Sequence, residues 1–304
     1  MIKELIKPAV ICYGEILWDN LPGGRMAGGA PMNVAYHLKT IGAESKLISR
    51  VGNDQPGAEL TNFCHHIGLP TTLIQIDAQY PTGEVDAKVM DNYEVVYDIL
   101  PGAAWDYIAY EDHLSKLAAS ADAFVFGSLA SRNTVSRDTL LKLLESAKFK
   151  VFDVNIRAPH YTKETLTLLL HQANLLKLNS NELHLLTEWF YKKGAKETDS
   201  IKLLQQNFGI NEIIVTKGSE GASYYNSATE FHGSAYPVKV ADTVGAGDSF
   251  LAAFIYKKLV GDPIPDVLDY ALGMGAFIAS QKGACPAYQP ADLHHFILQQ
   301  HQKI

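Results

Sequence analysis

The run Asp242-Thr-Val-Gly-Ala-Gly-Asp248 places small residues between two carboxylates, directly before a segment with apolar residues at helical spacing. Gly245, Ala246 and Gly247 let the backbone approach an anion closely. The free N–H groups in the first turn of a helix point at such an anion, and the helix dipole favours negative charge there. The run therefore predicts an anion hole for charge that develops between the β- and γ-phosphates of ATP.

Asp248 lies in the same predicted turn, where its carboxylate would lie beside the negatively charged phosphates of ATP. Its place makes chemical sense if it takes a proton from a hydroxyl that attacks the γ-phosphate. General-base help contributes about 10²–10⁴-fold, and positioning and electrostatics supply most of the rest in phosphoryl transfer. The alternative is an ordinary helix start, capped by Asp242 or Thr243. So many specified residue types would rarely occur together at these positions by chance, which favours the chemical interpretation over an ordinary helix start.

Other phosphate-binding patterns are absent from the sequence. There is no Gly-x-x-x-x-Gly-Lys-Ser/Thr loop and no His-Arg-Asp catalytic loop, which excludes two major kinase architectures. No Gly-x-Gly-x-x-Gly follows the first apolar run, which argues against a dinucleotide-binding fold.

Short apolar runs alternate with segments at helical spacing along most of the chain. This alternation predicts an α/β fold with a mostly parallel central sheet and helices on both faces. The expected strands are 9–16, 46–51, 123–126, 150–154, 175–178 and 212–216. The expected helices include 31–41, 58–67, 248–259, 266–281 and 291–300.

A β-rich stretch interrupts this rhythm. Residues 71–76, 84–90 and 94–99 are strand-like with little helix between them, and Asp91-Asn92 suits a tight hairpin. We expect a single domain over 1–304, with a small β-sheet lid inserted at approximately 71–100. A lone hairpin is only marginally stable, so the lid should pack on the domain or on a second subunit.

The composition limits the classes of partner. The 304 residues are 47% hydrophobic, enough for a large core, and the formal net charge of −7 argues against a nucleic-acid binder. Three widely spaced cysteines form no metal or disulfide pattern, which predicts a reduced, cytoplasmic protein. We find no signal peptide and no run of about 18 apolar residues, so we expect no membrane span.

The run at 242–248 resembles the second signature of the ribokinase-like (pfkB) carbohydrate kinase family. The first signature is similar to residues 28–35, Gly-Gly-Ala-Pro-Met-Asn-Val-Ala. Further matches, in the same order as in the family, are residues 14–19 (Gly-Glu-Ile-Leu-Trp-Asp), 152–157 (Phe-Asp-Val-Asn-Ile-Arg), 177–182 (Lys-Leu-Asn-Ser-Asn-Glu) and 216–221 (Thr-Lys-Gly-Ser-Glu-Gly). Several of these are most similar to fructokinases. The resemblance implies a ribokinase-like fold and a sugar kinase that uses ATP and Mg²⁺.

The resemblance also implies roles for individual residues in binding the acceptor. Asp19 would accept hydrogen bonds from sugar hydroxyls, which are charge-assisted and selective. Gly28 and Gly29 would bring the backbone against the sugar, and Asn33 would offer one donor and one acceptor. Arg157 would lie near the acceptor or its phosphate. The alternatives are a solvated loop for Asp19, a tight turn for the glycines and a surface salt bridge for Arg157.

A second set of implied roles concerns ATP and metal ions. Thr216, Gly218 and Gly221 would contact the nucleotide together with Asn179 and Gly247. Glu182 would act on Mg²⁺ through water; the alternative for Asn179 and Glu182 is a helix N-terminal capping box. The family often binds a monovalent cation such as K⁺, for which the implied positions are Asp242, Val244 and Gly283.

One departure from the family pattern concerns the lid. Only eight residues, 20–27, separate Asp19 from Gly28, where many relatives carry lid strands. We expect this gap to be too short for a pair of strands, so that the lid consists mainly of residues 71–100. A homodimer is left open.

The function predicted from the sequence is phosphorylation of a small carbohydrate, foremost fructose at its 6-hydroxyl. The alternative acceptors are 2-keto-3-deoxygluconate, ribose and a nucleoside; a nucleoside would favour an aromatic wall, for which Tyr93, Tyr97 and Trp105 are candidates. A different class is a non-catalytic sugar or nucleotide sensor. The intact Asp248, Gly245 and Gly247 argue against a sensor, because a sensor needs no base.

Overall fold

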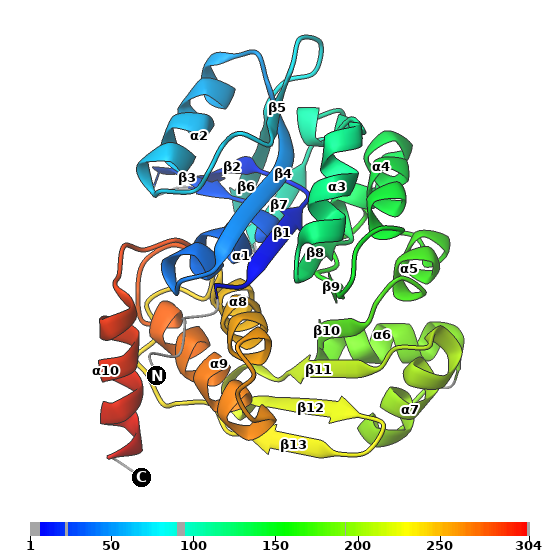
Figure 1. Ribbon diagram of the computed structural model, residues 1–304, viewed down its shortest axis with the longest axis vertical. Helices are drawn as coiled ribbons and strands as arrows, with labels where there is room; N and C mark the ends of the chain where they lie inside the picture. Colours follow the sequence, from blue (N-terminus) through cyan, green and yellow to red (C-terminus); the bar gives the residue numbers. More distant parts are fainter. Residues whose placement is uncertain (1–6, 22–23, 90–94, 192, 303–304) are drawn as a thin grey trace.

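A large, mostly parallel sheet forms the centre of the protein (Figure 1). The computed structural model describes residues 7–21, 24–89, 95–191 and 193–302, and within these ranges the sheet has nine strands. Their order is β13-β12-β11-β10-β9-β8-β1-β4-β5. The strands are β1 (Ala9–Tyr13), β4 (Glu44–Gly52), β5 (Ile74–Asp77), β8 (Ala123–Gly127), β9 (Lys150–Asp153), β10 (Leu175–Asn179), β11 (Glu212–Thr216), β12 (Ala222–Asn226) and β13 (Glu230–Gly233).

The strands from β5 to β11 pair in parallel, and β12 and β13 continue the sheet antiparallel at one edge. The chain first builds β1, β4 and β5 in one direction and then returns to the other side of β1 with β8. A crevice forms at the carboxyl ends of the strands where the order reverses in this way, and ligands bind there in open α/β sheets. The expected α/β fold with a mostly parallel sheet is confirmed.

Alternate residues of each buried strand face opposite sides of the sheet. In β1, Val10 and Cys12 belong to one hydrophobic core, and Ile11 and Tyr13 belong to the other. Strands buried on both faces read as continuous apolar runs, which is why the sequence predicted them well. Helices cover both cores, as Figure 1 shows.

The first core lies under α1 (Ala30–Thr40), α2 (Gln55–His66), α8 (Ala246–Leu259), α9 (Ile264–Ala279) and α10 (Pro290–His301). The second lies under α3 (Asp112–Ser120), α4 (Thr134–Leu144), α5 (Lys163–Leu170), α6 (Ser180–Phe190) and α7 (Glu197–Phe208). Short 3₁₀ helices lie at Ala104–Tyr107 (η1), Leu129–Ser131 (η2) and Gly218–Glu220 (η3). No helix in the described part of the chain has the length and apolar character needed to cross a bilayer.

A second sheet of four strands lies where the lid is expected, and we call this sheet the lid. Its order is β3-β2-β6-β7, from β2 (Leu17–Leu21), β3 (Gly24–Gly28), β6 (Gly83–Val89) and β7 (Val95–Ile99). The expectation that residues 20–27 are too short for strands is therefore wrong. β2 and β3 pair antiparallel with only two residues between them, and a two-residue connection is enough for a hairpin.

The lid boundary at residue 71 also needs correction. β5 pairs with β4 in the large sheet and is not part of the lid. The lid strands between 71 and 100 are thus β6 and β7, joined to β2 through the parallel pair β2·β6. The proposed turn at Asp91-Asn92 lies outside the described residues. The antiparallel hairpin β12·β13 was not among the predicted strands.

Candidate active site

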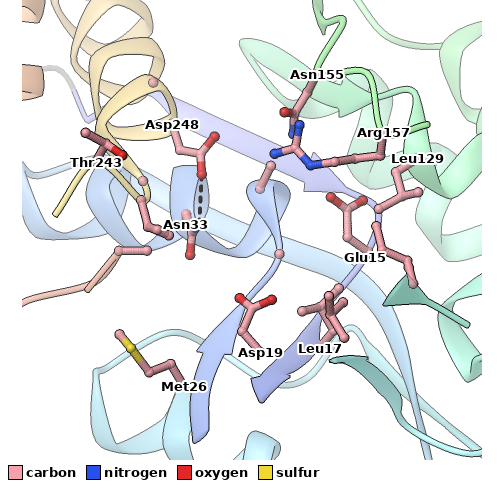
Figure 2. A pocket seen from close by; sticks show the side chains of 18 of the residues that line it. Glu15, Leu17, Asp19, Met26, Asn33, Leu129, Asn155, Arg157, Thr243 and Asp248 are labelled. Carbon is pink, nitrogen blue, oxygen red and sulfur yellow. Dashed lines mark hydrogen bonds between the residues drawn. The ribbon is translucent and has the colours of Figure 1, made fainter. Parts of the chain in front are cut away.

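A cavity of about 590 Å³ lies between the carboxyl ends of the central strands, the lid and the start of α8. It is lined from the segment after β1, the lid, the start of α1, η2, the segment after β9, the ends of β10 and β11, the first turn of α6 and the run at 242–248. The lining residues are Glu15, Leu17, Asp19, Met26, Ala27, Gly29, Ala30, Asn33, Val85, Ile99, Leu129, Asn155, Arg157, Lys177, Asn179, Glu182, Thr216, Asp242, Thr243, Val244, Gly245, Gly247, Asp248 and Ala284. Figure 2 shows the labelled side chains of this wall converging on one space.

The start of α8 forms one end of the cavity. Gly245 precedes the helix in the left-handed region, with φ 76°, and its carbonyl accepts a bond from the Ser249 N–H at 2.8 Å. A Cβ on Gly245 would lie 2.7 Å from Cα of Ala284, so only glycine fits that turn. Gly247 faces the cavity in the first turn of α8, and the structure confirms a helix N-terminus at the glycine-rich run.

Asp248 projects from the first turn of α8 into the cavity. Its Oδ2 accepts a hydrogen bond of 2.8 Å from Nδ2 of Asn33 (Figure 2). Enclosure by the surrounding atoms raises the pKa of Asp248 above its usual value; the Lys177 ammonium and the Asn33 bond lower it, and the Asp153 carboxylate raises it further. A carboxylate with a raised pKa at a helix N-terminus is suited to accept a proton.

α1 carries Asn33, and two glycines precede this helix. Gly29 has φ 113°, and a Cβ there would lie 2.4 Å from the carbonyl oxygen of Glu15. A Cβ on Gly28 would lie 2.3 Å from Oδ2 of Asp19. Gly28 therefore makes room for the Asp19 side chain, and it is not one of the residues that line the cavity.

Asp19 and Glu15 are two carboxyl groups in the half of the cavity near the lid. Burial raises the pKa of Asp19 to about 6, and the Arg157 charge opposes this. Burial raises the pKa of Glu15 to about 7, while its own N–H, Arg157 and the Ala30 N–H favour the ionised form. Oε2 of Glu15 is buried and has no hydrogen-bond donor among the described residues. Glu15 therefore resembles a functional carboxyl more than a structural one.

Arg157 is the exposed cation of this half of the cavity. It follows β9 in a segment where Asn155 has φ 38°, and its Nη1 donates to the carbonyl of Ile156 at 3.0 Å. The guanidinium points toward the space between Asp248 and Glu15 in Figure 2. No salt bridge of Arg157 occurs among the described residues.

Lys177 and Asp153 form a buried ion pair beneath the glycine-rich turn. Nζ of Lys177 lies 3.0 and 2.9 Å from the two oxygens of Asp153, on paired positions of β10 and β9. A Cβ on Gly247 would lie 3.3 Å from the same Nζ. Burial alone would lower the pKa of Lys177, but Asp153, Asp248 and Glu182 together raise it. The ammonium is therefore a fixed positive charge at the predicted anion hole.

Asn179 and Glu182 form a capping box at the start of α6. Oδ1 of Asn179 accepts from the Glu182 N–H at 3.0 Å, and Oε2 of Glu182 accepts from the Asn179 N–H at 2.8 Å. Oε1 of Glu182 accepts from the Ile156 N–H at 2.9 Å. The helix-capping alternative is thus realised, although both side chains also line the cavity.

A smaller cavity of about 310 Å³ adjoins the first and shares Asn179 and Thr216 with it. Gly218 lines this second space, together with Lys217, which is ion-paired to Glu197 at 2.7 Å. Gly221 lines neither cavity: a Cβ there would lie 1.9 Å from the carbonyl oxygen of Gly233, so it is a packing glycine.

Asp242 organises the loops beside the start of α8. Its Oδ1 accepts from the Val244 N–H at 3.0 Å, and its Oδ2 accepts from the Gly283 N–H at 3.1 Å. Asp242 and Val244 line the cavity, whereas Gly283 and Ala246 do not. No group of three His, Cys, Asp or Glu side chains among the described residues is arranged to hold a metal ion.

The structure brings most of the predicted site residues to one cavity: Asp19, Gly29, Asn33, Arg157, Asn179, Glu182, Thr216, Asp242, Val244, Gly245, Gly247 and Asp248. The sequence analysis gave no role to Glu15, Lys177, Asp153 or Asn155. A signal for three of them was present, because Glu15, Lys177 and Asp153 are charged residues within the predicted apolar strands 9–16, 175–178 and 150–154. Lys177 and Asp153 in particular interrupt neighbouring strands at matched positions.

Comparisons with known proteins agree with this geometry. The model of the pfkB family carbohydrate kinases matches residues 13–291. A fructokinase from Solanum tuberosum is 28% identical over 91% of this chain and 92% of its own. Among solved structures, the fructokinase of Xylella fastidiosa with bound ATP has a TM-score of 0.85 at 22% identity, covering 97% of this chain and 100% of that one. The fructokinase of Vibrio cholerae O395 with fructose, ADP and a calcium ion has a TM-score of 0.81 at 23% identity, covering 95% and 99%.

Proposed function

The chain belongs to the pfkB family of carbohydrate kinases, and from that premise we propose that it transfers the γ-phosphate of ATP to the 6-hydroxyl of fructose. A phosphotransferase acting on a sugar alcohol group follows from the family. The choice of fructose is the finer step, and it is supported by the names of the relatives, which are fructokinases over nearly the full length of the chain.

The observation that carries the proposal is the hydrogen bond of 2.8 Å between Asn33 and Asp248. It joins the helix that begins at the first signature to the helix that begins at the second. A sugar held by Asn33 would therefore present its hydroxyl to the carboxylate of Asp248. We assign Asp248 as the general base that takes the hydroxyl proton as the oxygen attacks phosphorus.

The phosphoryl group would be received at the start of α8. The first N–H groups of a helix point out of its end, and Gly245 and Gly247 line the cavity at this place. The N–H of Ala246 instead donates to the carbonyl of Thr243 at 3.3 Å, and Ala246 does not line the cavity. Lys177 adds a full positive charge beside Gly247. Donors fixed in this way stabilise charge that develops on the transferred group without reorganising during the reaction.

The sugar that accepts the phosphoryl group would lie under the lid. Asp19 and Glu15 would supply carboxylate oxygens that accept hydrogen bonds from sugar hydroxyls. The guanidinium of Arg157 would stabilise the negative charge that the sugar gains on phosphorylation. Leu17, Val85 and Ile99 give this end apolar walls. By excluding water from the site, the lid would suppress hydrolysis of ATP.

The nucleotide would extend from α8 toward the smaller cavity, where Asn179, Thr216 and Gly218 lie. ATP is used as its Mg²⁺ complex in such reactions, and Mg²⁺ keeps several waters and needs few protein carboxylates. Glu182 fits an indirect role of this kind, since both of its oxygens already accept backbone bonds. The ion would neutralise phosphate charge. A K⁺ site near Asp242, Val244 and the backbone of Gly283 stays a prediction.

The residues of the site also bear on the alternative functions, a nucleoside kinase and a non-catalytic sensor. For a nucleoside acceptor, Tyr93 lies outside the described residues and the side chain of Tyr97 is not described. Trp105 is fully buried in the core and lines neither cavity. A sensor is disfavoured because Asp248 and the anion hole are both intact. We also propose a cytoplasmic location, which the three free cysteines among the described residues support.

A substrate panel tests the function. Wild-type protein would be given MgATP with fructose, ribose, 2-keto-3-deoxygluconate or a nucleoside, and ADP release would be followed. We expect the highest kcat/KM with fructose. Asp248→Asn should lower kcat by about 10²–10⁴-fold while calorimetric binding of fructose persists. Asp266→Asn, which removes an exposed carboxylate from the first turn of α9, is the matched control. Unchanged turnover in Asp248→Asn would contradict the assignment of the base.

A further inference from the structure

Arg132 lies just outside the cavity, directly after η2, and its side chain is only 8% exposed. A guanidinium has five N–H donors, and each of them has an acceptor here. Nε bonds Oδ1 of Asp106 at 2.7 Å and Nη2 bonds Oδ2 of Asp106 at 2.8 Å. Nη2 also bonds the carbonyl of Leu100 at 2.6 Å, and Nη1 bonds the carbonyl of Ile99 at 3.1 Å and Nδ1 of His160 at 3.3 Å.

These acceptors belong to three segments: the end of the lid strand β7, η1, and the turn that follows Arg157. Ile99 ends the lid strand β7, and Leu100 follows it. Asp106 lies in η1, where the Trp105 ring packs 4.1 Å from Cζ of Arg132. The lid strand β6 begins at Gly83 against the same indole, since a Cβ on Gly83 would lie 2.2 Å from Nε1 of Trp105. The near ends of β6 and β7 therefore contact one cluster.

The contact with His160 connects this cluster to the turn that carries Arg157. The backbone N–H of His160 donates to the carbonyl of Arg157 at 2.7 Å and closes the turn 157–160. Arg157 and Ile99 both line the cavity. One buried guanidinium thus contacts the two segments that supply these residues.

We propose that Arg132 and His160 are positioning residues that hold the end of lid strand β7 and the Arg157 turn in fixed relation over the acceptor. The proposal rests on the proposed function for the place where the acceptor binds. His160 accepts from Arg132 as the neutral imidazole with its proton on Nε2. Burial lowers the pKa of His160, and the Arg132 charge lowers it further, against Asp106 and Asp98, so the neutral form is favoured.

Lysine cannot replace arginine at this position. An ammonium has three donors from a single nitrogen, whereas the planar fork of Arg132 reaches three segments at once. At His160, asparagine is the conservative replacement, because its side-chain oxygen can stand where Nδ1 accepts the bond. Alanine removes the acceptor and leaves a largely buried donor of Arg132 without a partner.

The test compares His160→Ala, His160→Asn and Arg132→Lys with the wild type. We expect His160→Ala to raise the KM for the accepted sugar by about tenfold, the equivalent of one lost hydrogen bond, with KM for ATP and kcat nearly unchanged. His160→Asn should restore most of the sugar KM. Arg132→Lys should raise it at least as much as His160→Ala. Matched controls are His66→Ala, at an exposed histidine ending α2, and Arg137→Lys on α4.

A role confined to stability would lower the melting temperature of these variants and leave the sugar KM unchanged, and that result would overturn the proposal. Amide hydrogen exchange gives a readout that does not depend on turnover. We expect faster exchange at residues 99–100 and 157–161 in His160→Ala than in His160→Asn. Equal exchange in the two variants would contradict the proposal. A wild type that phosphorylates no sugar would instead contradict the proposed function, while the exchange comparison would still decide the role of His160.

Discussion

The side-chain amide of Asn33 donates a hydrogen bond to Asp248 at 2.8 Å, across 215 residues of sequence. The orientation of the amide is supported on its other side, where the Cys285 thiol donates to Oδ1 of Asn33 at 3.3 Å. Asn33 is nearly inaccessible to solvent, at 4% exposure, so the contact is held by packing. The base and one acceptor-binding residue of the proposed reaction are therefore physically coupled.

This coupling predicts a shifted pH profile for Asn33→Ala. The Asn33 bond lowers the pKa of Asp248, so its loss should raise that pKa further. Because a base acts only when ionised, the acid limb of kcat at saturating substrate should move to higher pH by roughly one unit. Asn62→Ala on the exposed face of α2 is the control. An acid limb that stays at its wild-type position would show that the bond does not tune Asp248.

Lys177→Met is expected to lower kcat by about 10²-fold, because a preorganised charge at the anion hole is lost. It also leaves Asp153 buried without its partner, which should reduce the free energy of unfolding by about 3–5 kcal/mol. The double variant Lys177→Met/Asp153→Asn separates the two effects. Urea denaturation should show recovered stability, and the kinase assay should show no recovery. Recovery of both together would mean that Lys177 acts through stability alone.

Gly28→Ala is expected to weaken sugar binding although Gly28 does not line the cavity. A methyl group there would lie 2.3 Å from Oδ2 of Asp19, so the carboxylate must move. Displacement of a positioned group by about 1 Å costs up to about 10²-fold, and we expect sugar KM to rise within that limit. Gly127→Ala, where the nearest atom is 3.6 Å away, is the matched control in β8. If both variants bind sugar equally well, the position of the Asp19 carboxylate does not determine sugar binding.

The two carboxyls near the lid predict a pH-dependent sugar affinity. Both pKa values are raised, to about 7 for Glu15 and about 6 for Asp19, so both groups are ionised acceptors only above these values. As the pH falls through about 7 and then about 6 they take up protons, and the KM for sugar should rise. Glu15→Gln should remove the upper part of this dependence and Asp19→Asn the lower part. A sugar KM that is flat between about pH 5 and 8 would exclude both carboxyls from sugar binding.

Local sequence patterns were sufficient for the inner parallel strands of the central sheet and for the start of α8, but not for the sheet's edge strands β5, β12 and β13. The strand 212–216 was predicted with the bounds that β11 has, and the helix 248–259 begins two residues later than α8 does. Buried parallel strands are continuous apolar runs, and a glycine-rich turn before an apolar helix is a short-range signal. The lid was predicted less well, because β2 and β3 are short and half exposed, and their pairing with β6 joins segments far apart in sequence.

The sequence by itself was enough to propose the chemistry at Asp242–Asp248, since the turn, the proposed anion-binding backbone and the proposed base lie within seven neighbouring residues. The tertiary structure alone decided which distant charges face that turn. Lys177 meets Asp153 because β9 and β10 pair in register, and Glu15 lines the cavity at the carboxyl end of β1, between β4 and β8. Such contacts depend on which strands become neighbours and which face each residue takes, and these are properties of the assembled sheet.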